Sequence, residues 1–434
     1  MNKGLVIGGL AVVLGGGYYA GIAMTAKQVD EQFARYVSAM QESYAGVAEV
    51  SAQTQSGTFD AQSTLSMKFL DLPEEVLEWA GSDTLVFDIS YKHGFLKSDS
   101  VVTLADSQLK EQLAEYQANP SKPLLQLNAT YSYDIASSGV TVDGVMEMDG
   151  FTFDQDGDKV DVGAGSGSFS AGKDTLVADY KMAPSKVLID SVTIDIGEIG
   201  LVEEVKALGG DILTAKMSES AKGAFTVADI LVKGPGADVQ IQEVLIDVEQ
   251  AMQGERMELS VGYGAQKVKF VQGGRDFQFD QPKLALTFDL DSSAVISFVE
   301  QVQALQAQGS PVSDPEDIFP LLDPITQGGI NVDIDTLEVS SAGEQLKGNA
   351  ALKIAPFSMQ DAQSNPAALR DNLDMESSLK IAKGFLAQLP NYNPQQAQFA
   401  VSMGFLKEED DSYSFSATLK NGEMKVNGNP MPLF

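Results

Sequence analysis

Apolar and polar residues alternate with a period of two along most of the chain after Thr84. Successive side chains of a strand lie on opposite faces of a sheet, so this pattern predicts half-buried β-strands. Turn sequences such as Ser138-Gly139 and Pro235-Gly236 separate the alternating segments. Strands are expected over residues 85–91, 125–135, 140–148, 159–162 and 174–182.

Three segments interrupt this alternation in the same way. Each has the form apolar-x-apolar, then Asp or Gln, one further residue, and apolar-x-apolar again, at 187–194, 239–246 and 332–339. The inserted pair shifts the apolar positions by one, so each segment is predicted to be a bulged or face-switching strand. Their spacing along the chain is irregular, which argues against a solenoid repeat.

Shorter segments carry other signals. Apolar residues recur with helical spacing over 106–119, 201–222, 293–308 and 375–389, which predicts four helices. Four prolines between residues 309 and 326 predict a linker. Near the C-terminus, Asn421-Gly422 and Asn427-Gly428 separate alternating residues and predict tight β-hairpin turns, because Asn and Gly accept positive φ angles.

The N-terminal segment has no charged side chain from Gly4 to Ala26. A helix of this length rises about 34 Å, and the hydrocarbon core of a bilayer is about 30 Å thick. Lys3 favours an orientation with the N-terminus in the cytoplasm. Residues 4–26 are therefore predicted to anchor the protein in a bacterial inner membrane as a single pass, with the bulk of the chain periplasmic. A cleaved signal peptide is the alternative, because Gly21-Ile22-Ala23 offers small residues at a suitable spacing.

A second helix is expected over residues 27–50. Its apolar residues recur at helical spacing and form one stripe. The stripe consists of Val29, Phe33, Tyr36, Val37, Met40 and Tyr44. It is expected to pack either on the body of the protein or against a second copy in a homodimer.

The amino-acid composition argues against several classes of function. The chain has 29 Lys and Arg against 61 Asp and Glu, giving a formal charge of −32. This charge repels nucleic acid, so no nucleic-acid partner is expected. The chain has no cysteine, which excludes disulfides and thiolate metal sites. His93 is the single histidine, which excludes metal centres built from several histidines.

Candidate chemistry is sparse. Asp154, Asp156 and Asp158 are spaced like the first ligands of a calcium loop, but glycine stands at the fourth position and Gly165 at the twelfth, so an acidic hairpin turn is favoured. His93 has no neighbouring nucleophile motif and is interpreted as a structural strand residue. The glycine-rich segment 163–168 lacks the lysine of a phosphate-binding loop and predicts a flexible or closely packed strand. No catalytic residue and no cofactor are predicted.

Three segments carry a family resemblance. They are Met1-Asn2-Lys3 with the glycine-rich apolar run after it, the segment from Tyr91 to Ser98, and the closing segment from Gly422 to Leu433, which contains Val426-Asn427-Gly428-Asn429-Pro430. In these segments the chain resembles the YdgA-like proteins, a largely uncharacterised group from Gram-negative bacteria. The resemblance implies a single-pass inner-membrane protein with a β-rich periplasmic region that can form a homodimer. It implies no known reaction.

These observations predict an α+β, β-rich fold. Extended antiparallel sheets, curled or sandwich-like, carry several helices and follow an N-terminal transmembrane helix. The expected divisions are the anchor 1–26, the amphipathic helix 27–50, a β-rich periplasmic domain 51–310, a linker 311–326 and a C-terminal β-rich domain 327–434.

The predicted function is non-enzymatic binding or scaffolding in the cell envelope, with a lipid or an envelope protein as partner. One alternative is a lipid or apolar-ligand transfer protein with a hydrophobic groove. A second alternative is an envelope hydrolase, which requires clustered buried carboxylates in a cleft.

Overall fold

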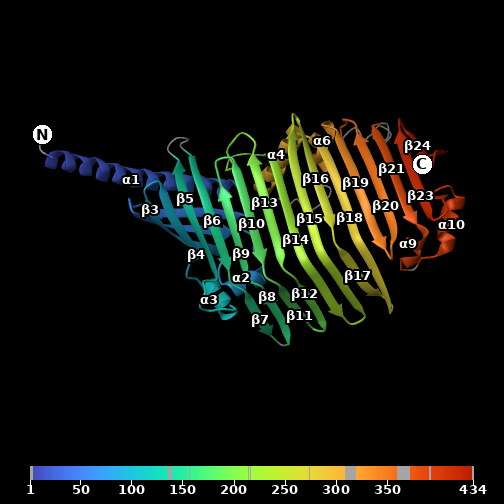
Figure 1. The fold of residues 1–434 in the computed structure, drawn as a ribbon, viewed down its shortest axis with the longest axis horizontal. Coiled ribbons are helices and arrows are strands. Elements are labelled where there is room, and N and C mark those ends of the chain that lie inside the picture. The colour runs from blue at the N-terminus through green and yellow to red at the C-terminus, as the bar shows by residue number, and fades with distance from the viewer. Residues whose placement is uncertain are drawn as a thin grey trace.

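A single antiparallel β-sheet runs through the protein (Figure 1). The computed structural model describes residues 3–134, 139–155, 157–213, 215, 217–272, 274–307, 319–358, 372–390 and 392–432. In spatial order, the main sheet consists of β1 (Ala48–Gln55), β2 (Asp60–Phe69), β3 (Thr84–Gly94), β4 (Lys97–Leu104), β5 (Leu125–Asp134), β6 (Gly139–Met148), β9 (Gly165–Ala171), β10 (Thr175–Met182), β13 (Ile199–Ala207), β14 (Ser218–Gly234), β15 (Ala237–Gln253), β16 (Arg256–Gly264), β18 (Arg275–Asp291), β19 (Ile330–Ser341), β20 (Glu344–Ile354), β21 (Leu373–Ala382), β23 (Ser412–Lys420), β24 (Glu423–Val426) and β25 (Asn429–Met431). The predicted β-rich fold with an extended antiparallel sheet is confirmed, and the sheet is one curled layer.

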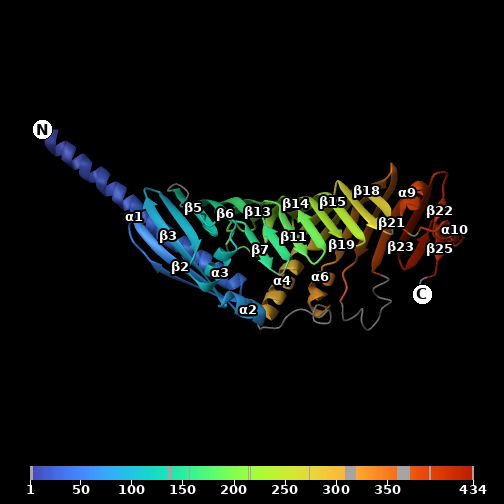
Figure 2. The same ribbon diagram turned by 90° about the horizontal axis from the view of Figure 1, so that it is seen from below.

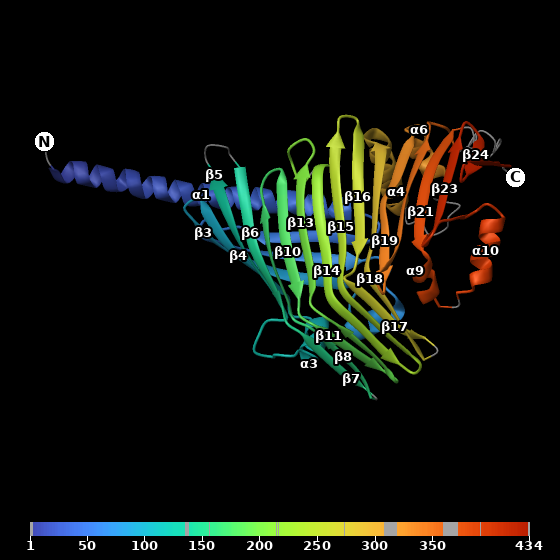
Figure 3. The ribbon, with the colours of Figure 1, turned by 45° about the vertical axis from the view of Figure 1, so that its right-hand side comes forward.

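A second row of strands continues the sheet on one side. Its members, in spatial order, are β7 (Phe151–Gln155), β8 (Asp158–Val162), β11 (Ser185–Ile189) and β12 (Val192–Ile196), followed by the far halves of β14 and β15, then β17 (Lys267–Gln272) and β18. The long strands β14, β15 and β18 therefore belong to both rows (Figure 3). The short strand β22 (Lys407–Glu408) pairs with the start of β23.

A crease separates the two rows. Two strands cross it at a residue with a left-handed backbone, Glu243 in β15 with φ 50° and Gln281 in β18 with φ 51°. At these residues the neighbouring strand changes from β17 to β16. Backbone hydrogen bonds continue through the crease, for example from Gln266 N–H to Gln242 O at 2.9 Å and from Gln281 N–H to Gln266 O at 2.9 Å. The sheet therefore bends without leaving its backbone groups unpaired.

The three interrupted segments have two different outcomes. Segment 239–246 contains Glu243 at the crease, and segment 332–339 contains a register shift between Ile334 and Leu337, so both predicted bulges are confirmed. Segment 187–194 was expected to be a third bulged strand, and this is wrong. It is the hairpin of β11 and β12, with a two-residue turn at Asp190 and Ser191. Asp190 has φ 53°, a conformation that Asp tolerates in such turns.

Most predicted elements are present. The five predicted strands correspond to β3, β5, β6, β8 and β10. The two predicted Asn-Gly turns join β23 to β24 and β24 to β25, and all four of their residues have positive φ. In the described residues the helices are α1 (Lys3–Ser43), α2 (Glu74–Ala80), α3 (Gln108–Glu115), α4 (Ser292–Ala307), the 3₁₀ helix η1 (Phe319–Leu322), α6 (Asp323–Gln327), α9 (Lys383–Gln388) and α10 (Pro394–Ser402).

Two predicted helices are wrong. Segment 201–222 contains the end of β13 and the start of β14, and segment 375–389 contains most of β21 followed by the short helix α9. In both segments strand pairing outweighs helix propensity, because each strand has partners on both sides. The helix expected over 27–50 ends at Ser43, since Gly46 with φ 82° turns the chain and Ala48 begins β1.

The second half of α1 packs on the N-terminal strands. Val29, Phe33 and Val37 are buried together with residues of β1, β2 and β3, and the ring of Phe33 lies 6.3 Å from that of Tyr91. Met40 is partly buried at the same contact, whereas Tyr36 and Tyr44 are exposed. Packing of the stripe within the chain is therefore confirmed, and the homodimer stays a prediction.

Helix α1 is continuous through the boundary predicted at residue 26. Its buried stripe begins earlier, at Ile22, and includes Thr25 and Ala26. Ile22, Thr25 and Ala26, the last residues of the predicted anchor, therefore pack on the protein itself. In the predicted anchor 4–26, the side chains of 4–18 lie outside the described residues. Within the part of the chain that the structure describes, no helix has an apolar stretch suited to crossing a membrane.

The sheet is continuous across the predicted linker 311–326. Residues 311–318 lie outside the described residues, and 319–326 form η1 and most of α6. On either side of this segment, β18 and β19 pair from Leu290 and Ile330 to Asp280 and Ser340. Strands of the predicted domains 51–310 and 327–434 therefore share one sheet.

Substitution of Gly163 tests the packing at the crease, because this glycine lies between β8 of the second row and β9 of the main sheet. An added Cβ would lie 2.0 Å from the Ala183 carbonyl oxygen, so we expect Gly163→Ala to lower the free energy of unfolding by about 1–3 kcal/mol. Gly223→Ala is the matched control, because its Cβ would lie 3.8 Å from the nearest heavy atom, the Val202 carbonyl oxygen. Urea unfolding measures both variants, and equal midpoints would contradict the close packing of the crease.

Candidate functional site

One face of the sheet carries an uninterrupted row of apolar residues. Residues that face each other across an antiparallel pair lie on the same face, so the strand register defines such rows. The row runs from β3 to β23 through Ile89, Val102, Leu127, Met146, Gly167, Tyr180, Leu201, Phe225, Ile246, Tyr263, Leu284, Leu337, Gly348, Leu379 and Phe415. Each member is aliphatic, aromatic or glycine. We call the face that carries this row the inner face.

The next two rows of facing residues, both on the same side of it, are also mainly apolar. One contains Val248, Val261, Leu286 and Ile334, together with the carboxylate of Glu203. The other contains Val142, Ala171, Leu176, Val205, Ala221, Gln250, Leu259, Phe288, Val332, Leu352, Met375 and Leu419. The inner face is therefore an apolar surface several rows wide.

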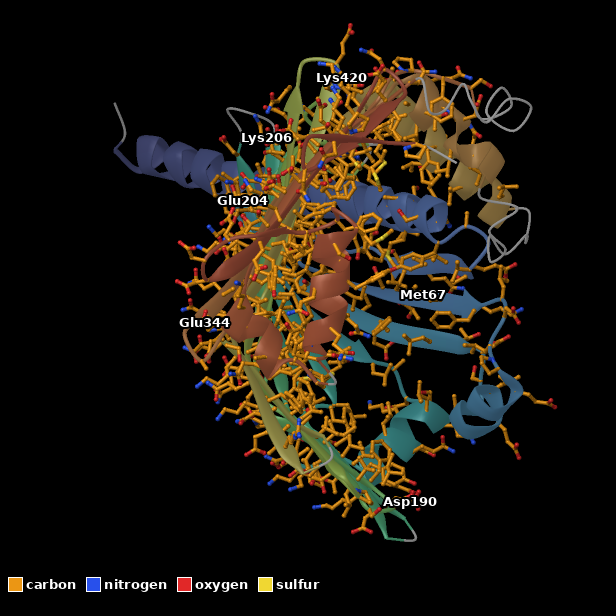
Figure 4. All side chains as sticks on the ribbon, turned by 90° about the vertical axis from the view of Figure 1, so that its right-hand side faces the viewer. Met67, Asp190, Glu204, Lys206, Glu344 and Lys420 are labelled. Carbon is orange, nitrogen blue, oxygen red and sulfur yellow. The ribbon has the colours of Figure 1, made fainter. Side chains whose placement is uncertain are left out.

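The opposite, outer face carries charged pairs together with exposed valines such as Val145, Val177 and Val202. Lys222 and Glu249 face each other across β14 and β15 with 2.7 Å between Nζ and Oε1, and Lys206 lies 2.8 Å from Glu219. Figure 4 shows Glu204 and Lys206 on one side of the sheet and Met67, an inner-face residue of β2, on the other. The sheet curls toward the inner side, where α4 and α6 also lie (Figure 2).

Helices pack on the strands at the two ends of the inner face, and several apolar residues of this face remain exposed. Helix α1 packs on β1, β3, β4 and β5, and α9 packs on β19, β20 and β21. Four members of the row are 36–44% exposed, namely Leu201, Phe225 and Tyr263 in the middle and Leu337 in β19. These exposed apolar side chains make the middle of the inner face a candidate binding surface.

The apolar surface continues across the crease. A one-residue bulge shifts the alternation by one, so Ile241 and Val244 of β15 lie on the same face although they are three positions apart. In the second row of strands, apolar residues also face one another across successive strands. They are Val160, Val187, Ile194, Val232, Val239, Phe270 and Phe277. The ring of Phe270 lies 5.0 Å from that of Phe277, and Phe279 lies 6.0 Å from Phe385 of α9.

The family model described as "Bacterial protein of unknown function (DUF945)" matches residues 1–434. The chain belongs to this family. Neither the curated proteins nor the solved structures include a match to the chain. The description of the family states no activity, so the function of this DUF945 protein has to be argued from its surfaces.

The calcium-like acidic residues lie in and beside a hairpin. Asp154 is the penultimate residue of β7, Asp158 begins β8, and Asp156 between them lies outside the described residues. A carboxylate oxygen of Asp158 accepts a hydrogen bond from the Asp190 N–H at 2.8 Å, which ties the neighbouring hairpin to this one. Among the described residues, no group of three or more acidic or histidine side chains is placed to hold a metal ion. The predicted acidic hairpin turn is confirmed.

The glycine-rich segment is a closely packed strand, as predicted. An added Cβ at Gly165 would lie 2.2 Å from the Tyr180 hydroxyl oxygen, and one at Gly167 would lie 2.9 Å from the Asp179 carbonyl oxygen. These glycines therefore let Tyr180 lie flat on β9. The segment contributes to the apolar inner face, since both glycines belong to it.

His93 lies in a buried polar cluster beneath α1. Its Nδ1 is 2.9 Å from the Ser98 hydroxyl, and its ring stacks 6.1 Å from that of Tyr91. His93 and Ser98 are 7% and 1% exposed, so the pair is enclosed and has no path to a substrate. Burial lowers the pKa of His93, and the negative charges of Asp30 and Asp60 oppose this shift without outweighing it. Burial also raises the pKa of Tyr91.

Two shallow hollows lie on the outer face. One, of about 650 Å³, is lined by Val101, Val145 and Val177, with Asp99, Asp143 and Asp179 also in its wall. The other, of about 540 Å³, lies near the C-terminal strands, and Lys347, Lys380 and Lys407 line it. Two of these lysines are paired with carboxylates, Lys347 with Glu338 at 3.5 Å and Lys380 with Glu409 at 3.1 Å. The hollow near the C-terminal strands therefore offers a polar and partly neutralised surface, whereas the larger one combines exposed valines with carboxylates.

The inner face is the candidate surface that the sequence did not locate. Alternation predicts that each strand has an apolar side, but it does not specify register or strand order. Apolar residues such as Leu201 and Phe225 belong to this surface. Leu201, however, lies in segment 201–222, which the sequence predicted to be helical.

Lowering the pH tests the His93 cluster. A histidine in an unfolded chain has a pKa of about 6.5, and burial lowers this pKa in the folded protein. The unfolded state therefore binds more protons as the pH falls below about 6.5, and the folded state loses stability there. We expect the free energy of unfolding of the wild type to fall more steeply between about pH 7.5 and pH 5 than that of His93→Gln.

His93→Gln serves as the control, because the wild type and this variant have the same carboxylates. Asp30, Asp60, Tyr91 and Ser98 remain around the substituted position. Parallel pH profiles would show that His93 does not couple protonation to folding.

Proposed function

We propose that this protein is a non-enzymatic binder of lipid acyl chains, tethered to a bacterial inner membrane and exposed to the periplasm. The observation that supports binding is the uninterrupted apolar row of the inner face. A ligand that covers this row must be long and apolar, because the row crosses many strands and its members carry no charge. Acyl chains have both properties, and their burial contributes about 0.8 kcal/mol for each methylene group.

The dimensions of the accessible region fit this ligand. Neighbouring strands of a sheet lie about 4.8 Å apart, so the seven strands from β6 to β16 in the row span about 29 Å. A bilayer hydrocarbon core of about 30 Å contains two layers of acyl chains, so the span equals about two acyl chains placed end to end. Helices at both ends of the inner face limit the ligand to the middle of the sheet.

Tethering rests on the sequence. Residues Gly4 to Gly21 contain no charged side chain, and a helix of this length rises about 27 Å. Residues from Ile22 onward pack on the sheet, so the uncharged part precedes the folded body directly. The resemblance to YdgA-like proteins supports the same location. A tether of this kind would hold the inner face close to a source of lipid.

Scaffolding of an envelope protein on the same face is the competing function. The inner face offers few unpaired polar groups in its central row, whereas protein interfaces carry about one hydrogen bond per 100–200 Å². An acyl chain needs no such partners. The chemistry of the surface therefore favours lipid.

Polar substitutions on the two faces test the proposal. We expect Leu201→Gln combined with Phe225→Gln to weaken acyl-chain binding by about tenfold, because both side chains lie in the middle of the row. The full chain is labelled in bacterial membranes with a photoactivatable fatty acid, and mass spectrometry measures the fraction of protein that carries the adduct.

The matched control removes two apolar side chains from the outer face. Val202 and Val177 are 48% and 44% exposed, compared with 42% and 36% for Leu201 and Phe225. Val202→Gln combined with Val177→Gln is expected to leave labelling unchanged. Loss of labelling in the control but not in the inner-face variant would assign the lipid to the outer hollow and refute the proposal.

A further inference from the structure

Helix α1 leaves the sheet within one turn. Ile22 and Thr25 are 3% and 1% exposed, whereas Tyr19 is 51% exposed. The Thr25 hydroxyl donates a hydrogen bond to the Gly21 carbonyl oxygen at 2.9 Å, so this turn contains no polar side chain directed toward solvent. The exit point of the helix is therefore between Tyr19 and Ile22 (Figure 1).

Three exposed aromatic side chains surround the exit point. Tyr19 comes from α1, Phe59 from the loop between β1 and β2, and Phe95 from the turn between β3 and β4. Phe59 and Phe95 are 57% and 46% exposed. We call Tyr19, Phe59 and Phe95 the aromatic collar.

Specific contacts hold the collar around the helix. The rings of Tyr19 and Phe59 meet edge to face with centroids 5.8 Å apart. The ring of Phe95 packs on Gly21 so closely that a Cβ on that glycine would lie 2.3 Å from it. The loop that carries Phe59 is fixed to β3, because the His93 N–H donates to the Phe59 carbonyl oxygen at 2.8 Å. Segments far apart in the sequence thus place three rings at one level of α1.

We infer that the aromatic collar docks into the interfacial region of the phospholipid bilayer that holds the tether. This inference rests on the proposed membrane tether and adds a surface of the folded body to it. The uncharged run of α1 begins at Gly4, before the collar, and ends at Ala26, so a bilayer that contains the part of the run before Tyr19 reaches the collar first. Aromatic rings are enriched at this depth of a bilayer, where an apolar ring contacts acyl chains and polar groups remain hydrated.

Docking of the collar orients the sheet. Phe95 follows the end of β3, and Ile89 of the same strand begins the apolar row of the inner face. The collar would therefore place the first strands of the inner face beside the bilayer and direct the later strands away from it. A flexible tether alone would leave this orientation undefined.

Fluorescence quenching by brominated lipids tests the collar. Trp79 is the single tryptophan, so a Trp79→Phe background is silent, and Phe95→Trp or Phe59→Trp then reports one position. The full chain is reconstituted into vesicles of phosphatidylcholine and phosphatidylglycerol with bromine at shallow or deep positions of the acyl chains. We expect both indoles to be quenched, more strongly by shallow than by deep bromine.

Phe399→Trp is the matched control. Phe399 is 65% exposed in α10, at the end of the sheet opposite α1 (Figure 1). Its indole is expected to keep its fluorescence in every vesicle. Two collar positions are used so that a defect of one variant does not decide the result.

Flotation of the vesicles separates the two proposals. Chains that float with the vesicles while neither collar indole is quenched would overturn the collar and leave the tether standing. Chains that fail to float would overturn both. Quenching at Phe399→Trp as strong as at the collar would also overturn the inference, because contact would then not be specific to the exit point.

Discussion

The architecture depends on the register of one unbroken antiparallel ladder. Backbone pairing fixes which side chains face each other, and alternation then assigns each of them to one side of the sheet. Because the register is maintained from β3 to β23, apolar side chains from many hairpins align into one continuous row. Even the crease preserves this assignment, since left-handed residues such as Glu243 and Gln281 absorb the shift at the point where the neighbours change.

The length of the apolar row has an energetic consequence. A sheet whose one face is apolar gains stability by covering that face, at about 25 cal/mol for each Å² removed from water. The helices cover the first strands and the last, but Leu201, Phe225 and Tyr263 in between remain over one third exposed. The uncovered centre costs stability in water, and an acyl chain bound there would remove this cost. The apolar surface is thus a property of the whole sheet, and no single strand carries it.

Sequence patterns were reliable where local chemistry decides the conformation. The Asn-Gly turns, the alternating strands and the helix at 292–307 follow from residues close in the chain. The errors arose where distant partners decide. Leu201–Lys222 has residues that favour a helix, yet its neighbours β10 and β15 impose strands. The same apolar pattern became a bulge at 239–246 and a hairpin at 187–194, because a local pattern does not specify which strands lie beside it.

The sequence by itself determined the β-rich class, the acidic solvent-exposed character, the missing thiol and multi-histidine chemistry, and the amphipathic stripe of Val29, Phe33 and Val37. These properties depend on composition and on residues within a few positions of each other. Only the tertiary structure decided that the apolar sides of all the strands share one surface, that Ile22 and Thr25 pack on the protein, and that Tyr19, Phe59 and Phe95 meet at the exit of α1. Each of these outcomes depends on contacts between segments far apart in the chain, and such contacts leave no local period in the sequence.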